Sequence, residues 1–476
     1  MVWSQLDVNK THISYSVLGI FLLIFSLFSL VIRERLLIGE SGIATIYGLI
    51  IGPHCLNWFN PQSWGNYLFN TIEISRILLC IDIVKASTEL PSMYIWRHGI
   101  SVLTVLFPCM IFGWLIIGLF IWLIIPRISF PVGLLISACV TATDPVLAQA
   151  VVGSGNFSKR VPTRVRHLLI CESACNDGLS VPFVYLALNL LLNNGDAELI
   201  VKDWLCISVL YMCVFGCIFG GIVGYCSRKF AQWAVKYNTI DETSLFAFYL
   251  TISLICAGFG SMLGFDDLLA SFCAGAAFCW DGWVFEKIEH SNAIPVIDLL
   301  LNISFFTYFG SIIPWQEFNN DILGLDCWRL IIVALVIIFL RRIPISLIVQ
   351  FFCPDIKGWR EALFVGHFGP IGVSALFGCI IAISELESNV LHIEHGPTVE
   401  YPTSNEHYQA IRIMWPMVTF IVLVSIIVHG SSVAALAFGK YLYLHLAAKK
   451  TEMDHNPKNE ERIFERVEDT SDSLQD

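Results

Sequence analysis

Long apolar blocks, separated by short polar stretches, follow one another along most of the chain. Thirteen blocks are apolar enough and nearly long enough to cross a bilayer, which takes about 20 residues in a helix. Their expected limits are 12–32, 36–53, 72–90, 99–125, 130–153, 164–192, 203–227, 243–264, 266–284, 296–314, 325–350, 360–384 and 409–437. A helix satisfies its own backbone hydrogen bonds inside lipid. The pattern therefore predicts an all-α polytopic membrane protein with thirteen transmembrane helices.

The lysines and arginines of the connecting loops indicate the direction of crossing. With the N-terminus outside, the inner loops hold thirteen basic residues, which are Arg33, Arg35, Arg97, Lys159, Arg160, Arg164, Arg166, Arg228, Lys229, Lys236, Lys287, Lys357 and Arg360. The outer loops hold three, which are Lys10, Arg127 and Lys202. Because basic residues concentrate in cytoplasmic loops, we expect the N-terminus outside and the C-terminus inside.

Two of the predicted helices are broken. The fifth segment is interrupted at residues 141–145 and the twelfth at residues 366–370, and each interruption ends in a proline. Proline removes a backbone donor and disfavours a helical conformation in the residue before it. The two segments lie seven apart and so cross in opposite directions, which predicts inverted repeats of segments 1–6 and 8–13. Broken helices at membrane depth line protein cavities, and transporters bind ions there.

Charge separates the chain into two predicted domains. Only 14% of the residues are charged, against about 25% in soluble domains. The net charge is −11, and residues 451–476 carry nine acids and three bases, which accounts for −6 of it. We expect a membrane domain over 1–440 and an acidic, disordered cytosolic tail over 441–476. No feature suggests nucleic-acid binding, and no phosphate-binding loop or cofactor motif occurs.

The sixth segment carries two carboxylates where hydrocarbon is expected, Glu172 and Asp177. A charged side chain at that depth is costly, so it pairs with another group or faces a water-filled cavity. On a helix Ser173 and Asp177 share one face, which Asn176 borders, whereas Glu172 points elsewhere. We therefore expect Asp177, Asn176 and Ser173 to offer oxygen ligands to a small cation.

Glu172 needs a different partner, and the eleventh segment supplies Arg341 and Arg342. Both arginines lie about as deep in the membrane as Glu172 on the predicted topology. The sequence predicts a buried ion pair between Glu172 and one of them, and it leaves open which. The alternative is that both arginines extend to the inner membrane surface.

The break in the fifth segment brings a third carboxylate, Asp144, beside the hydroxyls of Thr141 and Thr143. A broken helix frees carbonyl oxygens that can ligate a cation. We expect a direct or supporting role in ion binding. In the alternative, Asp144 compensates the dipoles of two half-helices.

Further ionisable residues lie near segment ends and breaks. Asp266 and Asp267 open the ninth segment and are expected to attract cations or to form a solvated helix start. His367, in the twelfth-segment break, either senses protons or makes a hydrogen bond between helices. Asp82 and Lys85, with Glu89, share a face of the third segment, and we interpret them as a set that neutralises its own charge.

These motifs together resemble the cation/proton antiporter superfamily in its Asn-Asp branch. The more specific resemblance is to the fungal plasma-membrane sodium/proton antiporters, over about residues 1–440. The stretches that carry it are Thr141 to Pro145, Glu172-Ser173 with Asn176-Asp177, Met1 to Asp7, Gly52-Pro53-His54, Phe265 to Leu269, and Val365 to Gly372.

The resemblance implies roles for residues at matching positions. It implies that Asp177 binds a cation and a proton in turn, that Na⁺ is held at Asp177 and Asp144, and that Asn176 accompanies electroneutral exchange. Other implied positions are Thr143 in the broken helix, the supporting residues Asp266, Asp267 and His367, and the structural pair of Glu172 with Arg341 or Arg342.

The resemblance also implies a homodimer with a dimerisation part and a moving core. Such a protein would lie in plasma-membrane lipid and export Na⁺ or Li⁺ in exchange for H⁺, for salt tolerance and pH homeostasis. Alternatives are a K⁺-accepting or electrogenic exchanger, a cation channel, or an intramembrane aspartate hydrolase. The single Asn-Asp site beside broken helices favours a secondary antiporter, which is a transporter and not an enzyme.

Overall fold

The computed structural model describes residues 8–32, 39–144, 161–193, 195–240, 245–288, 293–391 and 407–453. Within these ranges the chain is helical apart from connecting segments and one isolated bridge between Asn320 and Leu325. The helices are α1 (Lys10–Leu30), α2 (Glu40–Ile51), η3 (Pro61–Trp64), α3 (Tyr67–Thr88), α4 (Tyr94–Ile124), α5 (Phe130–Cys139), α7 (Thr163–Leu179), α8 (Val181–Leu192), α9 (Ala197–Asp203), the π-helix η5 (Trp204–Phe215), α10 (Gly216–Lys236), α11 (Leu245–Leu263), α12 (Asp267–Phe278), α13 (Trp283–Ile288), α14 (Ala293–Ile312), η6 (Trp315–Asn319), α15 (Cys327–Leu340), α16 (Ile343–Val349), α17 (Trp359–His367), α18 (Val373–Leu391) and α19 (Tyr408–Met453).

The prediction of an all-helical membrane protein is confirmed. In the described part of the chain, seven helical stretches are long and apolar enough to cross a membrane, namely Lys10–Ser29, Tyr94–Ile124, Thr163–Leu192, Ala197–Lys236, Cys327–Val349, Val373–Val390 and Tyr408–Ser432. Each of the thirteen predicted segments overlaps a helix or consecutive helices. The number of membrane crossings, their directions and the inverted repeats stay predictions.

Both predicted breaks coincide with the ends of helices. Helix α5 ends at Cys139 and residues 141–144 are not helical, while Pro145 lies outside the described residues. Helix α17 ends at His367 and α18 begins at Val373. In this second break the backbone groups of Gly369, Pro370 and Ile371 form hydrogen bonds with other elements.

Two further interruptions occur where the sequence analysis marked none. The sixth segment is divided at Ser180, between α7 and α8, and Pro182 lies in the first turn of α8. The eleventh segment is divided at Arg341 and Arg342, between α15 and α16. In both cases a proline stands in the first turn of the second helix, where its missing N–H costs no hydrogen bond.

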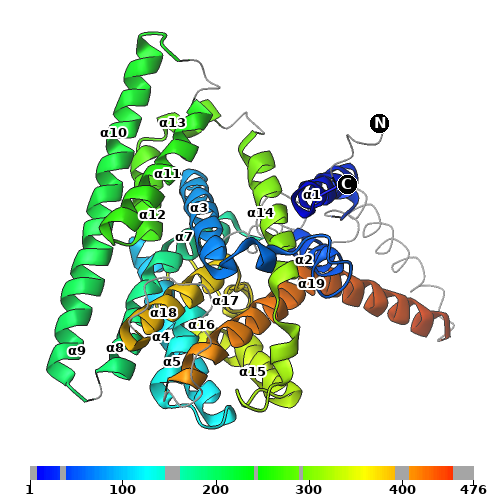
Figure 1. Cartoon of the computed structure of the whole chain (residues 1–476). Helices are drawn as coiled ribbons and strands as arrows, with labels where there is room; N and C mark the ends of the chain where they lie inside the picture. Colours follow the sequence, from blue (N-terminus) through cyan, green and yellow to red (C-terminus); the bar gives the residue numbers. More distant parts are fainter. Residues whose placement is uncertain are drawn as a thin grey trace, which may run out of the picture.

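Helix α3 is packed among several other helices (Figure 1). Its neighbours are α11, α12, α14, α7 and α18. Helix α10 stands along one edge of the molecule and is packed closely on α12. A Cβ added at Gly220 or Gly224 of α10 would come within 2.0 or 2.1 Å of the carbonyl oxygens of Ala270 or Ala274 of α12. These glycines therefore allow the two backbones to touch.

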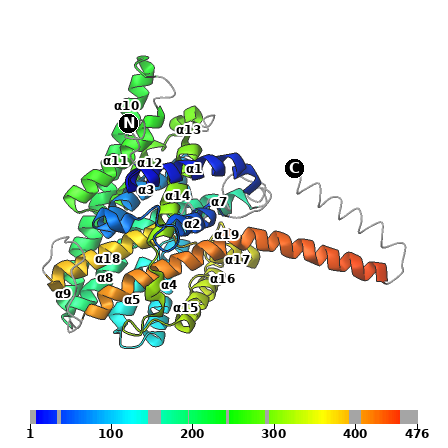
Figure 2. The ribbon, with the colours of Figure 1, turned by 45° about the vertical axis from the view of Figure 1, so that its right-hand side comes forward.

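Helix α19 extends away from the rest of the molecule at its C-terminal end, as Figure 2 shows. The helix continues to Met453, so the boundary predicted at 440 falls inside it. Residues 454–476, which hold most of the predicted disordered tail, lie outside the described part of the chain.

Candidate ion-binding site

The two broken helices meet at Asp144. Its backbone N–H donates to the carbonyl oxygen of Pro370 at 2.8 Å, and its Oδ2 accepts the N–H of Val373, the first residue of α18, at 2.8 Å. Asp144 is fully buried. A carboxylate at a helix N-terminus satisfies a free N–H and offsets the positive end of the helix dipole. A side chain at Gly372 would collide with this carboxylate, since an added Cβ would lie 1.9 Å from Oδ2.

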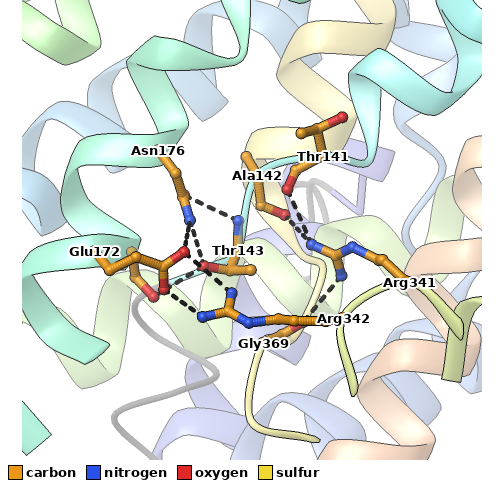
Figure 3. A network of polar contacts seen from close by, with 9 residues as sticks. Thr141, Ala142, Thr143, Glu172, Asn176, Arg341, Arg342 and Gly369 are labelled. Atoms are coloured by element: carbon orange, nitrogen blue, oxygen red, sulfur yellow. Dashed lines mark hydrogen bonds and ion pairs between the residues drawn. The ribbon is translucent and has the colours of Figure 1, made fainter. Parts of the chain in front are cut away.

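Arg341 joins the same two breaks through their carbonyl oxygens (Figure 3). Its Nη2 donates to the carbonyls of Thr141 and Ala142, at 3.0 and 2.9 Å, and its Nη1 donates to the carbonyl of Gly369 at 2.9 Å. The breaks leave these carbonyls without helical partners, and a buried carbonyl without a partner is costly. Arg341 therefore bonds backbone and not Glu172.

Arg342 forms the ion pair with Glu172. Its Nη1 and Nη2 donate to Oε1 and Oε2 at 3.1 and 2.7 Å. Both side chains are buried, with 6% and 1% of their surfaces exposed. A two-bond contact between guanidinium and carboxylate is the strong form of this interaction. The sequence offered two arginines for one pair, and the geometry gives each arginine its own partners.

Asn176 connects the ion pair to the broken fifth segment. Its Nδ2 donates to Glu172 Oε1 at 3.0 Å and to Thr143 Oγ1 at 2.6 Å, and its Oδ1 accepts the N–H of Thr143 at 3.0 Å. The hydroxyls of Thr143 and Ser173 lie 3.0 Å apart. Asn176, Thr143 and Ser173 were all expected as ion ligands, and their side chains bond one another and Glu172. The Thr141 hydroxyl bonds its own helix, at the Ser137 carbonyl.

Asp177 differs from its neighbours. It is fully buried, and neither carboxylate oxygen accepts a hydrogen bond from any described residue. The Ser374 side chain, in the first turn of α18, faces this carboxylate, and the Ser374 hydroxyl likewise has no hydrogen bond in the described part of the chain. Sequence reasoning missed Ser374, although its place just after the Pro370 break could have indicated it. Buried carboxylates without donors are rare, so these oxygens are suited to bind a cation or a proton.

Asp266 and Asp267 lie apart from the crossing and line a cavity of about 1500 Å³. Both are buried. Asp266 caps α12, with Oδ1 accepting the N–H of Leu269 at 2.9 Å. Asp267 pairs with Arg76 of α3 at 2.6 Å, a partner that sequence reasoning missed. The same cavity reaches Val181, four residues beyond Asp177, which is about one helical turn.

His367 is joined to α19. Its Nε2 lies 2.9 Å from the Ser432 hydroxyl, and its ring centroid is 5.1 Å from that of His429. This contact has the geometry of the hydrogen bond between helices that the sequence offered as an alternative to proton sensing. His367 is not among the groups that bond Asp144 or Asn176 in the described contacts.

Fold and site together define a class of protein: an integral membrane protein in which two broken helices cross beside buried carboxylates, the arrangement in which secondary transporters bind ions. The sequence model of the family described as "Sodium/hydrogen exchanger, transmembrane" matches residues 20–439. The chain belongs to this family.

Relatives and a solved structure agree with this assignment. The chain is 54% identical over 461 residues to "Na(+)/H(+) antiporter 2" of Zygosaccharomyces rouxii, covering 96% of this chain and 57% of the relative. It is 54% identical over 443 residues to the "Na(+)/H(+) antiporter" of Saccharomyces cerevisiae, and the match covers 93% of this chain and 45% of that relative. The chain thus spans about half the length of these relatives. It is 41% identical over 461 residues to a "Na(+)/H(+) antiporter" of Schizosaccharomyces pombe, and this match covers 95% of this chain and 96% of that relative.

The fold is that of the sodium proton antiporter MjNhaP1 from Methanocaldococcus jannaschii. The TM-score to that structure is 0.65 at 20% sequence identity, and the match covers 90% of this chain and 99% of that one.

Proposed function

We propose that this protein is a secondary active antiporter that exports Na⁺, and also Li⁺, across the plasma membrane in exchange for H⁺. The observation that carries the proposal is the fully buried Asp177 carboxylate, which has no hydrogen-bond donor in the described part of the chain. Its relatives in three fungi are named Na⁺/H⁺ antiporters. Salt tolerance and pH homeostasis are the roles expected of such a protein in a cell.

Asp177 is the group that binds Na⁺ and H⁺ in turn. A bare carboxylate in a low-dielectric interior is costly, so only the cation-filled or protonated site crosses easily between inward and outward states. Na⁺ displaces the proton on the cytosolic side, and a proton displaces Na⁺ outside. Asp144 is the second acidic group of the site. The hydrogen bonds among Asn176, Thr143 and Ser173 hold the helix that carries Asp177 at a fixed distance from the break in the fifth segment.

One exchangeable negative charge carries either one Na⁺ or one H⁺, so exchange is electroneutral. Moving a net charge would make transport voltage-dependent by about 2.3 kcal/mol per 100 mV. If Asp144 also releases its proton in each cycle, two protons move per Na⁺ and the exchanger is electrogenic. Asn176 is neutral and stands beside Asp177, which favours the one-for-one stoichiometry.

The remaining site residues have structural or gating roles. Glu172 and Arg342 form a buried pair that fixes α7 to the start of α16, and Arg341 fixes the two breaks to each other. Asp266 and Asp267 attract cations into the cavity, and Thr141 and His367 support the broken helices.

The architecture behind this function has thirteen crossings, with the N-terminus outside and the C-terminus in the cytosol. Segments 1–6 and 8–13 form inverted repeats, and a moving core works against a dimerisation part in a homodimer. Residues 1–440 form the membrane domain and the rest a cytosolic tail.

Ion flux in proteoliposomes tests the proposed function. With the voltage clamped by K⁺ and valinomycin, an imposed pH gradient should drive Na⁺ or Li⁺ flux at a rate that is independent of voltage. Voltage-dependent exchange would indicate the electrogenic alternative, and K⁺-driven proton flux the K⁺-accepting one. Uncoupled current would indicate a channel, and absence of flux would leave the intramembrane hydrolase.

A further inference from the structure

A second group of buried charges lies between α3 and α14. Lys85 Nζ is 2.6 Å from Asp298 Oδ2, and Asn302 Nδ2 donates to Asp298 Oδ1 at 3.1 Å. The side chains of Lys85 and Asp298 expose only 6% and 13% of their surfaces. Asp298 lies 213 residues after Lys85 in the sequence, so the set that was expected to neutralise itself on α3 also includes residues of a second helix.

Asp82 completes this group and has no donor of its own. Only 2% of the residue is exposed, and neither carboxylate oxygen accepts a hydrogen bond from a described donor. Its polar contact is the side chain of Asp298, another carboxyl group. Ionised carboxylates only accept hydrogen bonds, so a bond between these two exists only when one of them carries a proton.

The count of charges leads to the same conclusion. Among the described residues, one buried lysine, Lys85, serves the carboxylates of Asp82 and Asp298, and it is already paired with Asp298. Glu89 lies 3.7 Å from Lys85, but its side chain is 40% exposed, so water solvates it. Tyr249 of α11 also faces the group and carries no positive charge. An isolated buried carboxylate is costly, and a proton on Asp82 or Asp298 removes that cost.

The position of α3 connects this group to the crossing of the broken helices. Helix α3 packs against α7 and α18 as well as against α11, α12 and α14. The charge of Asp82 interacts with that of Asp144, whose carboxylate caps α18. A change of charge at Asp82 therefore changes the electrostatic potential at the place where a cation would bind.

We propose that Asp82 and Asp298 share one proton and form a second proton-binding site, separate from Asp177, whose occupancy is coupled to cation binding at the crossing. This inference rests on the proposed antiport. The step is a simple ionisation in which the shared proton leaves to water and both carboxylates remain. Loss of the proton adds a negative charge that favours a bound cation, and a bound cation favours loss of the proton to the same extent, because coupling is reciprocal.

Infrared difference spectra of the purified protein, recorded between acid and alkaline pH, test the shared proton without any transport. We expect a C=O stretching band of a buried protonated carboxylic acid that is absent in Asp82→Asn and in Asp298→Asn and shifted in Asp82→Glu. The band should persist in Asp177→Asn and in the control Glu89→Gln. If no such band responds to changes at Asp82 or Asp298, the two residues share no proton and the proposal is wrong, whether or not the protein exchanges Na⁺ for H⁺.

The coupling is tested by the pH dependence of the apparent KM for Na⁺ in proteoliposomes. In Asp82→Asn the site stays neutral, so KM should equal that of the wild type at acid pH and exceed it by about fivefold at alkaline pH, the lower end of ordinary coupling between sites. Glu89→Gln should follow the wild type throughout. An Asp82→Asn protein that exchanges ions with an unchanged KM profile would show that the second site is not coupled to transport.

Discussion

The polar residues at the crossing fall into two groups according to their hydrogen bonds. Glu172, Asn176 and Thr143 are satisfied by one another and by Arg342. The side chains of Asp177 and Ser374 are buried and make no hydrogen bonds to the described residues. We infer that the first group holds the shape of the site and that the second binds the ion.

Glu172→Gln tests the first group. Removing one partner of a buried ion pair leaves the other charge uncompensated and costs about 3–5 kcal/mol. We expect low expression and a lower midpoint of thermal unfolding in detergent. Glu73→Gln is the control, because Glu73 is 42% exposed and 3.7 Å from Arg76, and exposed pairs contribute about 0–1 kcal/mol. A Glu172→Gln protein as stable as the control, with only its ion affinity changed, would contradict the structural role.

Ser374→Ala tests the second group. The Ser374 hydroxyl makes no hydrogen bond to a described residue, so its removal should leave the unfolding midpoint nearly unchanged. The apparent KM for Na⁺ should rise about tenfold, which corresponds to about 1.4 kcal/mol of lost ligation. Ser180→Ala is the matched control, since the Ser180 hydroxyl donates to the Asp177 backbone carbonyl and not to its carboxylate. Equal KM values for the two variants would show that Ser374 does not contribute to Na⁺ binding.

At the scale of elements, the breaks determine which side chains meet. The break between α15 and α16 falls at Arg341 and Arg342, and there neighbouring arginines reach different partners. A continuous helix was expected at this position, so the sequence could name both arginines but could not divide their roles. Prolines and glycines did indicate the breaks of the fifth and twelfth segments, because these residues act on the local backbone.

The contact between α10 and α12 gives a prediction at this scale. Gly220→Ala should destabilise the protein, because its Cβ would lie 2.0 Å from the Ala270 carbonyl oxygen and the helices would have to separate. Overpacking of this kind typically costs about 1–3 kcal/mol. The neighbouring Gly221→Ala has no atom within 4 Å of the added Cβ, and alanine favours helix. Thermal unfolding of the pair is the measurement, and equal midpoints would show that the helices do not pack this closely.

The partners that sequence reasoning missed share a physical reason. Arg76 pairs with Asp267 across 191 residues, and Asp298 pairs with Lys85 across 213. Such pairs depend on how helices pack, whereas apolar periodicity and proline positions report on one helix at a time. Sequence therefore identified several carboxylates that are out of place in lipid, such as Glu172 and Asp177, but it missed Arg76 and Asp298, which lie on other helices than their partners.

At the scale of the whole molecule, the predicted orientation places one rim of the large cavity outside the cell. Cys55, which is exposed, follows α2 on that predicted outer side. A membrane-impermeant maleimide applied to intact cells should label the wild type more than Cys55→Ser. Equal labelling in intact cells, with a difference only after permeabilisation, would show that the orientation of the entire chain is opposite to the predicted one.

The central claim is that one buried carboxylate, Asp177, carries Na⁺ and H⁺ in turn. The most direct measurement is Na⁺-driven proton movement in proteoliposomes containing Asp177→Asn, beside wild type and Ser180→Ala, with thermal unfolding of each protein. Because the amide is permanently neutral, the account predicts a folded Asp177→Asn protein whose proton movement equals that of protein-free liposomes, while Ser180→Ala still exchanges. Na⁺/H⁺ exchange that persists in a folded Asp177→Asn protein would contradict it.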